Sequence, residues 1–237
     1  LMNGAWASVL VFSGTFDRTI AAFEMARELG LSFQVNTTVT RSTKPELSKI
    51  ARVVEANGAA LWDLFFLVPT GRGTSSELMS ADEHDEVYSW ILANQRDWSI
   101  PAKTTLGQPY RRATVLKRLA AEGRDFRSLS SEEITAAWPG PPTNDGRGIF
   151  FISHLGEIYP SGFLPISAGN VRTDSPVEVY RNSPIFKTVR DRSLLQGKCG
   201  YCPFNAICGG SRSRAYALTG DMTAADPTCR FEPARIS

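Results

Sequence analysis

The sequence predicts an α/β fold in which a parallel sheet covered by helices is followed by a small α+β domain. Two observations lead to this prediction. Helix-like and strand-like segments alternate with short connections through the first seventy residues, and all four cysteines lie in the last 39 of the 237 residues. With 42% hydrophobic residues, the chain is long enough to bury one large core, or one core with a smaller one appended.

Hydrophobic spacing places the first helices and strands. Apolar residues recur at helical spacing over residues 15–29, and apolar and polar residues alternate over residues 31–36, which indicates a strand with one apolar face. Pro45 suits the first position of a second helix, and residues 60–68 then form a second, buried strand. In a parallel sheet of this kind we expect functional residues at the carboxyl ends of the strands.

Two later helices are predicted from their capping residues. Ser80 with Glu83, and Ser130 with Glu133, have the three-residue spacing of a capping box ahead of apolar residues. His84 then falls in the first turn of the earlier helix, where we expect an exposed imidazole.

The last third of the chain predicts small elements. Residues 149–152 and 157–159 flank Gly156 and indicate a short β-hairpin with the glycine in its turn. Ser-Pro pairs at 175–176 and 183–184 mark the starts of two short helices.

A break in the helical pattern divides the chain. Residues 139–142 read Pro-Gly-Pro-Pro and cannot continue a helix. We therefore expect a first domain over residues 1–138, a linker over 139–148 and a second domain over 149–237.

Charge and hydropathy exclude some partners. The 26 Lys and Arg residues nearly balance 24 Asp and Glu residues without long blocks of one sign, so neither nucleic acid nor an anionic membrane is expected as a partner. Asp63 interrupts the most apolar run, which is shorter than the roughly 20 residues of a membrane span. The first ten residues lack the basic segment of a secretory signal, and we expect a cytoplasmic protein.

The cysteine segment has the spacing C-x2-C-x5-C-x20-C, formed by Cys199, Cys202, Cys208 and Cys229. Gly209-Gly210 after the third cysteine would let backbone amides approach sulfur closely. A structural zinc site usually pairs two C-x2-C-like knuckles, and a disulfide framework would spread its cysteines through a short secreted chain. Both remain alternatives, and we favour an iron–sulfur centre with four thiolate ligands.

The same segment resembles a known family. Three stretches carry this resemblance: FISHLGEIYPSGFLPISAGNV, SPVEVYRNSPIFKTVRD and CGYCPFNAICGGSRSRAYALTGD. They are similar to the SPASM, or shorter twitch, domain of radical S-adenosylmethionine (SAM) enzymes, especially those that modify haem and haem d1 precursors. Ser161 and Ser211 stand where full SPASM domains carry further cysteines. The resemblance therefore implies one auxiliary [4Fe-4S] cluster, held by the four cysteines.

The N-terminal part resembles the later half of the radical SAM (β/α)6 barrel, through SGTFDRTIAAFEMARELGLSFQVNTTVTR and the Pro-x-Gly-Arg-Gly loop at residues 69–73. Asn36 and Thr38 point the same way at the end of a strand and are candidates to contact SAM, and Arg72 in the loop is a candidate to bind a carboxylate. The alternative interpretations are polar residues that finish a strand and a solvated loop. The expected fold is thus a partial radical SAM barrel followed by a small α+β iron–sulfur domain of the SPASM/twitch type.

The SAM-cleaving motif C-x3-C-x2-C is missing, because no cysteine precedes Cys199. The chain as written is therefore not expected to generate a radical. The resemblance begins near the fourth barrel strand, which leaves two explanations, a piece of a longer enzyme or a shortened paralogue. We expect the former, because half a barrel leaves a raw sheet edge.

These observations give one functional hypothesis and two alternatives. The hypothesis is the auxiliary-cluster portion of a radical SAM oxidoreductase that uses SAM and a [4Fe-4S] cluster. Its partners would be a small molecule such as a tetrapyrrole, or a peptide, together with an electron donor protein. The alternatives are a non-catalytic iron–sulfur module for electron transfer or partner binding, and a zinc-stabilised binding domain.

Arg212 and Arg214 lie beside the proposed cluster. They either stabilise the thiolates or pair at the surface with Asp221 or Asp226.

Overall fold

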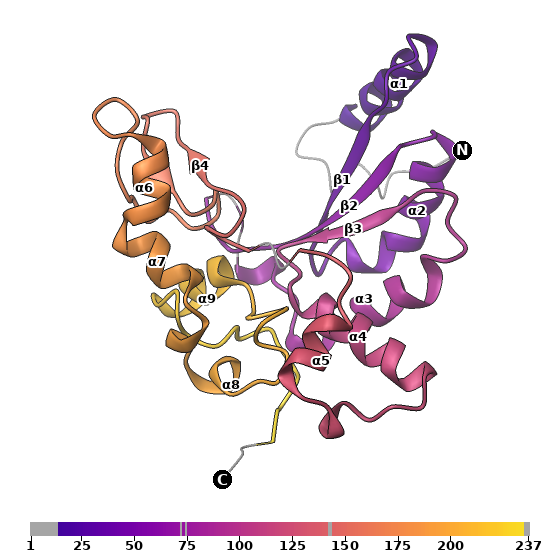
Figure 1. The fold of residues 1–237 in the computed structure, drawn as a ribbon. Coiled ribbons are helices and arrows are strands. Elements are labelled where there is room, and N and C mark those ends of the chain that lie inside the picture. Colours follow the sequence, from indigo (N-terminus) through magenta and orange to yellow (C-terminus); the bar gives the residue numbers. More distant parts are fainter. Residues whose placement is uncertain (1–13, 72, 74, 142–143, 235–237) are drawn as a thin grey trace. The chain divides into compact units, whose positions relative to one another are not determined.

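The computed structural model describes residues 14–71, 73, 75–141 and 144–234 (Figure 1). The described residues fall into two units, which are treated separately. The first contains residues up to 67 together with 90–105, and the second contains residues 68–89 and those from 106 onward. The domain limits expected from the sequence stay a prediction. The expected fourth barrel strand near the start of the chain lies outside the described residues.

A three-stranded parallel sheet forms the centre of the first unit (Figure 1). Its strands are β1 (Gln34–Val39), β2 (Leu61–Phe66) and β3 (Ala102–Thr105), in that order. The register pairs Val35 with Trp62 and Trp62 with Ala102. The predicted parallel sheet is therefore confirmed.

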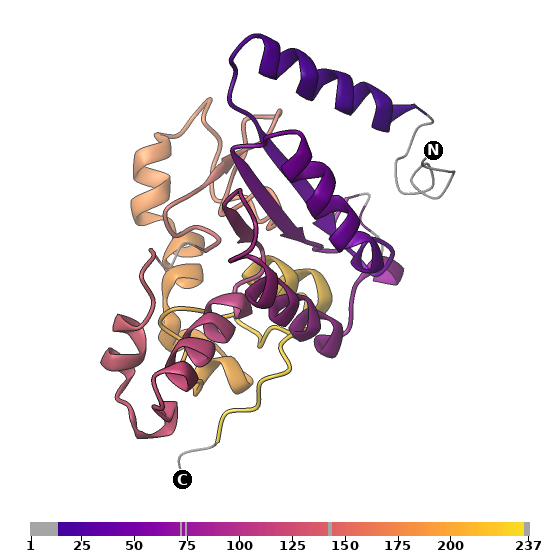
Figure 2. The ribbon, with the colours of Figure 1, turned by 90° about the vertical axis from the view of Figure 1, so that its right-hand side faces the viewer.

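Helices accompany the sheet in this unit: α1 (Thr15–Glu28), the 3-10 turn η1 (Lys44–Glu46), α2 (Leu47–Ala56) and the C-terminal end of α3 (Ala81–Asn94). In Figure 2, α2 lies in front of the strands and covers one face of the sheet. Its buried side chains are Leu47, Ala51 and Val54, whose spacing places them on one side of the helix. This apolar stripe packs α2 onto the sheet.

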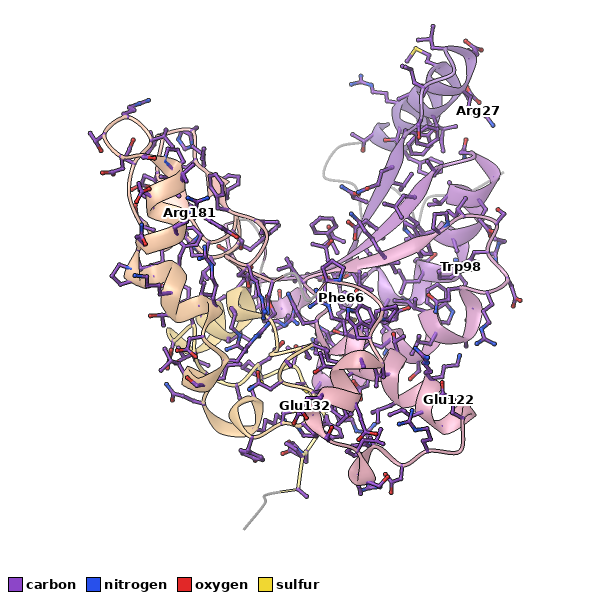
Figure 3. The ribbon with its side chains drawn as sticks, in the orientation of Figure 1. Arg27, Phe66, Trp98, Glu122, Glu132 and Arg181 are labelled. Atoms are coloured by element: carbon purple, nitrogen blue, oxygen red, sulfur yellow. The ribbon has the colours of Figure 1, made fainter. Side chains whose placement is uncertain are left out.

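The face of the sheet that carries Trp62 has an aromatic core. The Trp62 ring is fully buried and lies 6.3 Å from Trp90 and 5.1 Å from Trp98, measured between ring centroids. The indole Nε1–H of Trp62 donates to Thr37 Oγ1 at 2.9 Å, so its polar group is satisfied inside the core. Phe66, at the end of β2, and Trp98 are labelled in Figure 3.

The opposite face of the sheet carries several polar side chains. Asp63 in β2 is 1% exposed, and its Oδ2 accepts from Thr105 Oγ1 at 2.9 Å and lies 3.1 Å from Lys103 Nζ. Asn36 and Thr38 lie on this same face, two residues apart in β1.

The second unit is mainly helical. It begins with η2 (Ser75–Glu77), the first part of α3, α4 (Pro109–Ala121), η3 (Phe126–Ser128) and α5 (Ser131–Ala136). It continues with β4 (Phe151–Ile152), β5 (Ile158–Tyr159), α6 (Pro176–Asn182), α7 (Pro184–Arg190), η4 (Arg192–Leu194), α8 (Gly197–Gly200) and α9 (Arg212–Thr219).

The locally encoded elements of this unit match the sequence predictions. Both capping boxes form, with Glu83 and Glu133 each bonded to its serine in both directions. Strands β4 and β5 pair antiparallel, and Gly156 adopts a φ of 85° in their turn. Helices α6 and α7 begin at the two predicted Ser-Pro pairs.

The hydrophobic core of the second unit adjoins the cysteine segment. Its buried members are Val115, Leu119, Ile134, Phe204, Ile207 and Cys208. Phe126, Cys202 and Phe231 pack against them, and the Phe204 ring lies edge-on to Phe231 at 5.4 Å. Two cysteines, Cys208 and Cys202, are thus held by this core.

His84 corrects one expectation. It is 1% exposed, not solvent-facing, and its Nδ1 lies 2.8 Å from the carbonyl of Ser80, one turn earlier in the chain. Burial, aided by Arg214, lowers the pKa of His84 to about 4, so the ring is neutral at pH 7. Its place on the same stripe as Tyr88 and Ile91 explains the burial, because all three lie on one face of α3.

Within the described residues, none of the helices combines the length and apolar character that crossing a bilayer requires.

Candidate metal centre

All four cysteines line one cavity in the second unit. Cys199 lies in α8, Cys202 and Cys208 in the segment that follows, and Cys229 near the C-terminal end of the described chain. The cavity has a volume of about 330 Å³, which includes the part that is open to solvent. Its other lining residues are Arg112, Lys198, Asn205, Gly209, Gly210 and Phe231. All four thiols are free, without a disulfide among them.

Each sulfur has one N–H donor beside it. The backbone N–H of Gly210 donates to Cys208 Sγ at 3.4 Å, and Arg212 Nη2 lies 3.9 Å from Cys199 Sγ. The backbone N–H groups of Phe204 and Phe231 stabilise the thiolate forms of Cys202 and Cys229. The Gly-Gly approach to sulfur that the sequence predicted is confirmed at Gly210.

Bringing these thiols together disfavours their ionisation. Burial raises the pKa of Cys208 to about 12 and that of Cys202 to about 11, and the neighbouring thiols add to both shifts. Burial also raises the pKa of Cys229. Four thiolates at this site therefore need a nearby positive charge, and a metal centre that displaces the thiol protons would supply it.

The two glycines after Cys208 are required by their surroundings. Gly210 has a φ of 67°, and a Cβ there would lie 2.7 Å from Arg212 Nη2 and 3.3 Å from Cys199 Sγ. Gly209 has a φ of 65°, and its Cβ would fall 1.5 Å from Arg192 Nη1. A larger residue at Gly209 would displace Arg192, and a larger residue at Gly210 would displace Arg212 and Cys199, which belong to the site itself.

A buried ion pair holds the segment that leads to Cys229. Arg214 and Asp226 are both fully buried, with Arg214 Nη2 3.2 Å from Asp226 Oδ2. Burial alone would raise the pKa of Asp226, but Arg214 and the backbone N–H groups of Ser211 and Thr228 lower it to about 2. Arg214 also donates to the carbonyl of Leu106 at 3.1 Å.

The two arginines singled out in the sequence therefore differ. Arg212 reaches a sulfur and also donates to the carbonyls of Met222 and Ala224. Arg214 pairs with Asp226, one of the two acids expected, but it does so in the interior and not at the surface.

The donor set fits an iron–sulfur cluster. Four cysteine sulfurs surround a space, each has an N–H donor, and glycine backbone forms part of the wall. Among the described residues, no group of three or more His, Cys, Asp or Glu side chains gathers in an arrangement that would bind a single metal ion.

Comparisons with known proteins extend this result. No protein-family model matches the sequence. The AdoMet-dependent heme synthase of Methanosarcina barkeri is 34% identical over 224 residues, which span 94% of this chain and 62% of that protein. The pre-heme d1 synthase of Dinoroseobacter shibae is 24% identical over 238 residues, which span 96% of this chain and 58% of that protein.

Solved structures share the fold. Streptococcus suis SuiB bound to its precursor peptide SuiA has a TM-score of 0.60 at 17% identity, covering 91% of this chain and 48% of that one. SuiB has also been solved with S-adenosylmethionine. The chain is a homologue of radical SAM enzymes that carry a SPASM-type domain. It spans about 60% of the length of the curated relatives that it matches.

This homology confirms two expectations. The fold class, a partial radical SAM barrel with a small α+β SPASM-type domain, agrees with the solved structures. The cofactors of the radical SAM enzymes, SAM and iron–sulfur clusters, are those that the sequence predicted.

The candidate SAM contacts remain predictions. Asn36 and Thr38 are both exposed within β1, and Asn36 Oδ1 accepts from Gln34 Nε2 at 2.5 Å. Arg72 lies outside the described residues.

Arg112 was missed by sequence reasoning. It belongs to α4, 87 positions before the first cysteine in a chain numbered continuously, yet it lines the cavity with the four sulfurs. Residues 102–112, AKTTLGQPYRR, resemble a segment of radical SAM enzymes and end at Arg112, which was the one signal available in the sequence.

Proposed function

We propose that Cys199, Cys202, Cys208 and Cys229 hold one [4Fe-4S] cluster in the auxiliary domain of a radical SAM oxidoreductase. The observation that carries this proposal is the convergence of all four sulfurs on one cavity, each with its own N–H donor. When bound, such a cluster supplies one-electron transfer.

The chain's own residues have separable tasks in this proposal. The thiolates bind iron, and the N–H donors lower the energy of the negative charge on sulfur. Lys198 adds a positive charge at the cavity wall and donates to the carbonyl of Cys229 at 2.6 Å. Asp226 and Arg214 fix the approach of the chain to Cys229.

The substrate class follows from the relatives. A heme synthase is 34% identical over 94% of this chain, whereas a PqqA peptide cyclase that covers the same share is 24% identical, and this difference favours a tetrapyrrole over a peptide for the whole protein. Four reduced thiols suit the reducing cytoplasm, which we propose as its compartment. The two SAM-contact candidates in β1, Asn36 and Thr38, and with them Arg72, belong to the same proposal.

The cluster is tested by anaerobic reconstitution with iron and sulfide, followed by visible absorption and electron paramagnetic resonance (EPR). Cys202→Ser should abolish or alter the cluster signal. Ala206→Ser introduces the same side chain at an exposed position of the same segment and should leave the signal unchanged. A wild-type protein with no cluster signal, or a Cys202→Ser variant with an unaltered one, would refute the assignment.

A second measurement separates the enzyme from a non-catalytic electron-transfer module. We expect the coding sequence upstream of Leu1 to contain C-x3-C-x2-C, and the protein translated from it to consume SAM. A start codon immediately before Leu1, with a reconstituted cluster, would instead support the module. A single zinc ion without iron would support the zinc-stabilised domain.

A further inference from the structure

One charged group at the cluster cavity has donor capacity that the protein does not use. Arg112 is 5% exposed and lines the cavity together with the four cysteine sulfurs. Its Nε is fully buried and has no hydrogen-bond acceptor among the residues that the structure describes. A buried charged donor without an acceptor is costly, so it requires an explanation.

The other contacts of Arg112 fix the position of its guanidinium. Nη2 pairs with Asp85 Oδ1 at 2.9 Å, and Cζ lies 4.8 Å from the centre of the Phe231 ring. Phe231 itself lines the cavity and follows Cys229 by two residues. These two contacts therefore hold the guanidinium at the cavity wall.

The charge of Arg112 is placed where it would act on a cluster. Reduction adds one negative charge to the centre, and a fixed cation in a buried, weakly screened site stabilises that charge. The negative charge of Asp85, whose side chain is 26% exposed and therefore partly solvated, offsets the positive charge of Arg112.

We infer that Arg112 is a positioning residue for the proposed cluster. Its Nε–H donates toward the cluster, and its positive charge raises the reduction potential of the cluster. This inference rests on the proposed function, and it adds a specific role for a residue outside the cysteine segment.

The test is an anaerobic redox titration of the reconstituted protein, monitored by visible absorption and EPR. Arg112→Gln removes the charge, and Arg112→Lys restores it. Arg118→Gln is the matched control, because Arg118 lies on the same helix, is largely exposed and pairs with Glu122 at 2.9 Å. Asp85→Asn removes the carboxylate that offsets Arg112 and keeps every donor in place.

The four variants have distinct expected results. Arg112→Gln should make reduction at least tenfold less favourable, a shift of 59 mV to lower potential for one electron. Arg112→Lys should recover most of that shift, and Arg118→Gln should change the equilibrium less than threefold. Asp85→Asn should shift the potential in the opposite direction, upward.

The outcomes separate this inference from the proposed function. A wild type without a cluster refutes the proposed function. If the wild type binds a cluster, and if Arg112→Gln and Asp85→Asn both keep the wild-type reduction potential, only the role of Arg112 is refuted. If Arg112→Gln binds no iron, Asp85→Asn decides, because an unchanged or lowered potential in that variant contradicts the inference.

Discussion

The buried ion pair between Arg214 and Asp226 predicts a large and pH-dependent contribution to stability. Asp226→Asn removes the negative charge and leaves Arg214 buried without its carboxylate partner. Breaking a buried pair on one side typically costs about 3–5 kcal/mol. We therefore expect Asp226→Asn to lower the free energy of unfolding by a few kcal/mol at pH 7.

The pKa of Asp226 gives a second measure of the same interaction. Its pKa is about 2 in the folded protein against an ordinary aspartate value of 3.8, and this difference corresponds to about 2 kcal/mol. Because the folded-state pKa is the lower one, this stability is present above pH 3.8 and is lost as the pH falls through about 2. This free energy is smaller than the cost of breaking the pair, because it describes only the protonation of Asp226 with its side chain still in position. The cost of the variant should thus lie between about 2 and 5 kcal/mol.

The assay is urea denaturation under reducing, anaerobic conditions, followed by circular dichroism at several pH values. Glu132→Gln, at an exposed position on α5 (labelled in Figure 3), is the control and should change the free energy of unfolding by less than about 0.5 kcal/mol. The difference between wild type and Asp226→Asn should shrink as the pH is lowered toward 2. A loss below about 1 kcal/mol at pH 7, or a loss independent of pH, would refute the ion-pair account.

Two further changes have defined outcomes. Gly210→Ala should sharply reduce iron uptake on reconstitution, because its Cβ would lie 2.7 Å from Arg212 Nη2, whereas Gly220→Ala, which has a similar φ of 79° but nothing within 4 Å, should keep it. Equal iron content in the two variants would contradict the close packing around the sulfurs. Ser130→Ala removes the capping box of α5 and should cost about 1 kcal/mol in urea denaturation, and an unchanged midpoint would contradict that role.

Elements encoded by neighbouring residues were predictable. The capping boxes, the hairpin around Gly156 and the two Ser-Pro helix starts each depend on a few adjacent residues, so their geometry could be read locally. The clustering of the cysteines was equally predictable, because three of them lie within ten residues of each other.

The contacts between distant segments were not predictable in the same way. Arg112 is buried by tertiary packing that no local pattern encodes, and arginine is mostly found at the surface. His84 shares a buried stripe of α3 with Tyr88 and Ile91, but its place in the first turn of the helix favoured an exposed ring. Arg212 and Arg214 are separated by one position, yet only the former reaches a sulfur, because the latter is directed to Asp226 and Leu106. Such differences depend on the fold of the whole unit.

Metal and sulfide content after anaerobic reconstitution tests the central claim most directly. The four-thiolate site predicts four iron and four acid-labile sulfide per chain, with no zinc retained. One zinc ion without iron, or a protein that takes up neither metal, would contradict it.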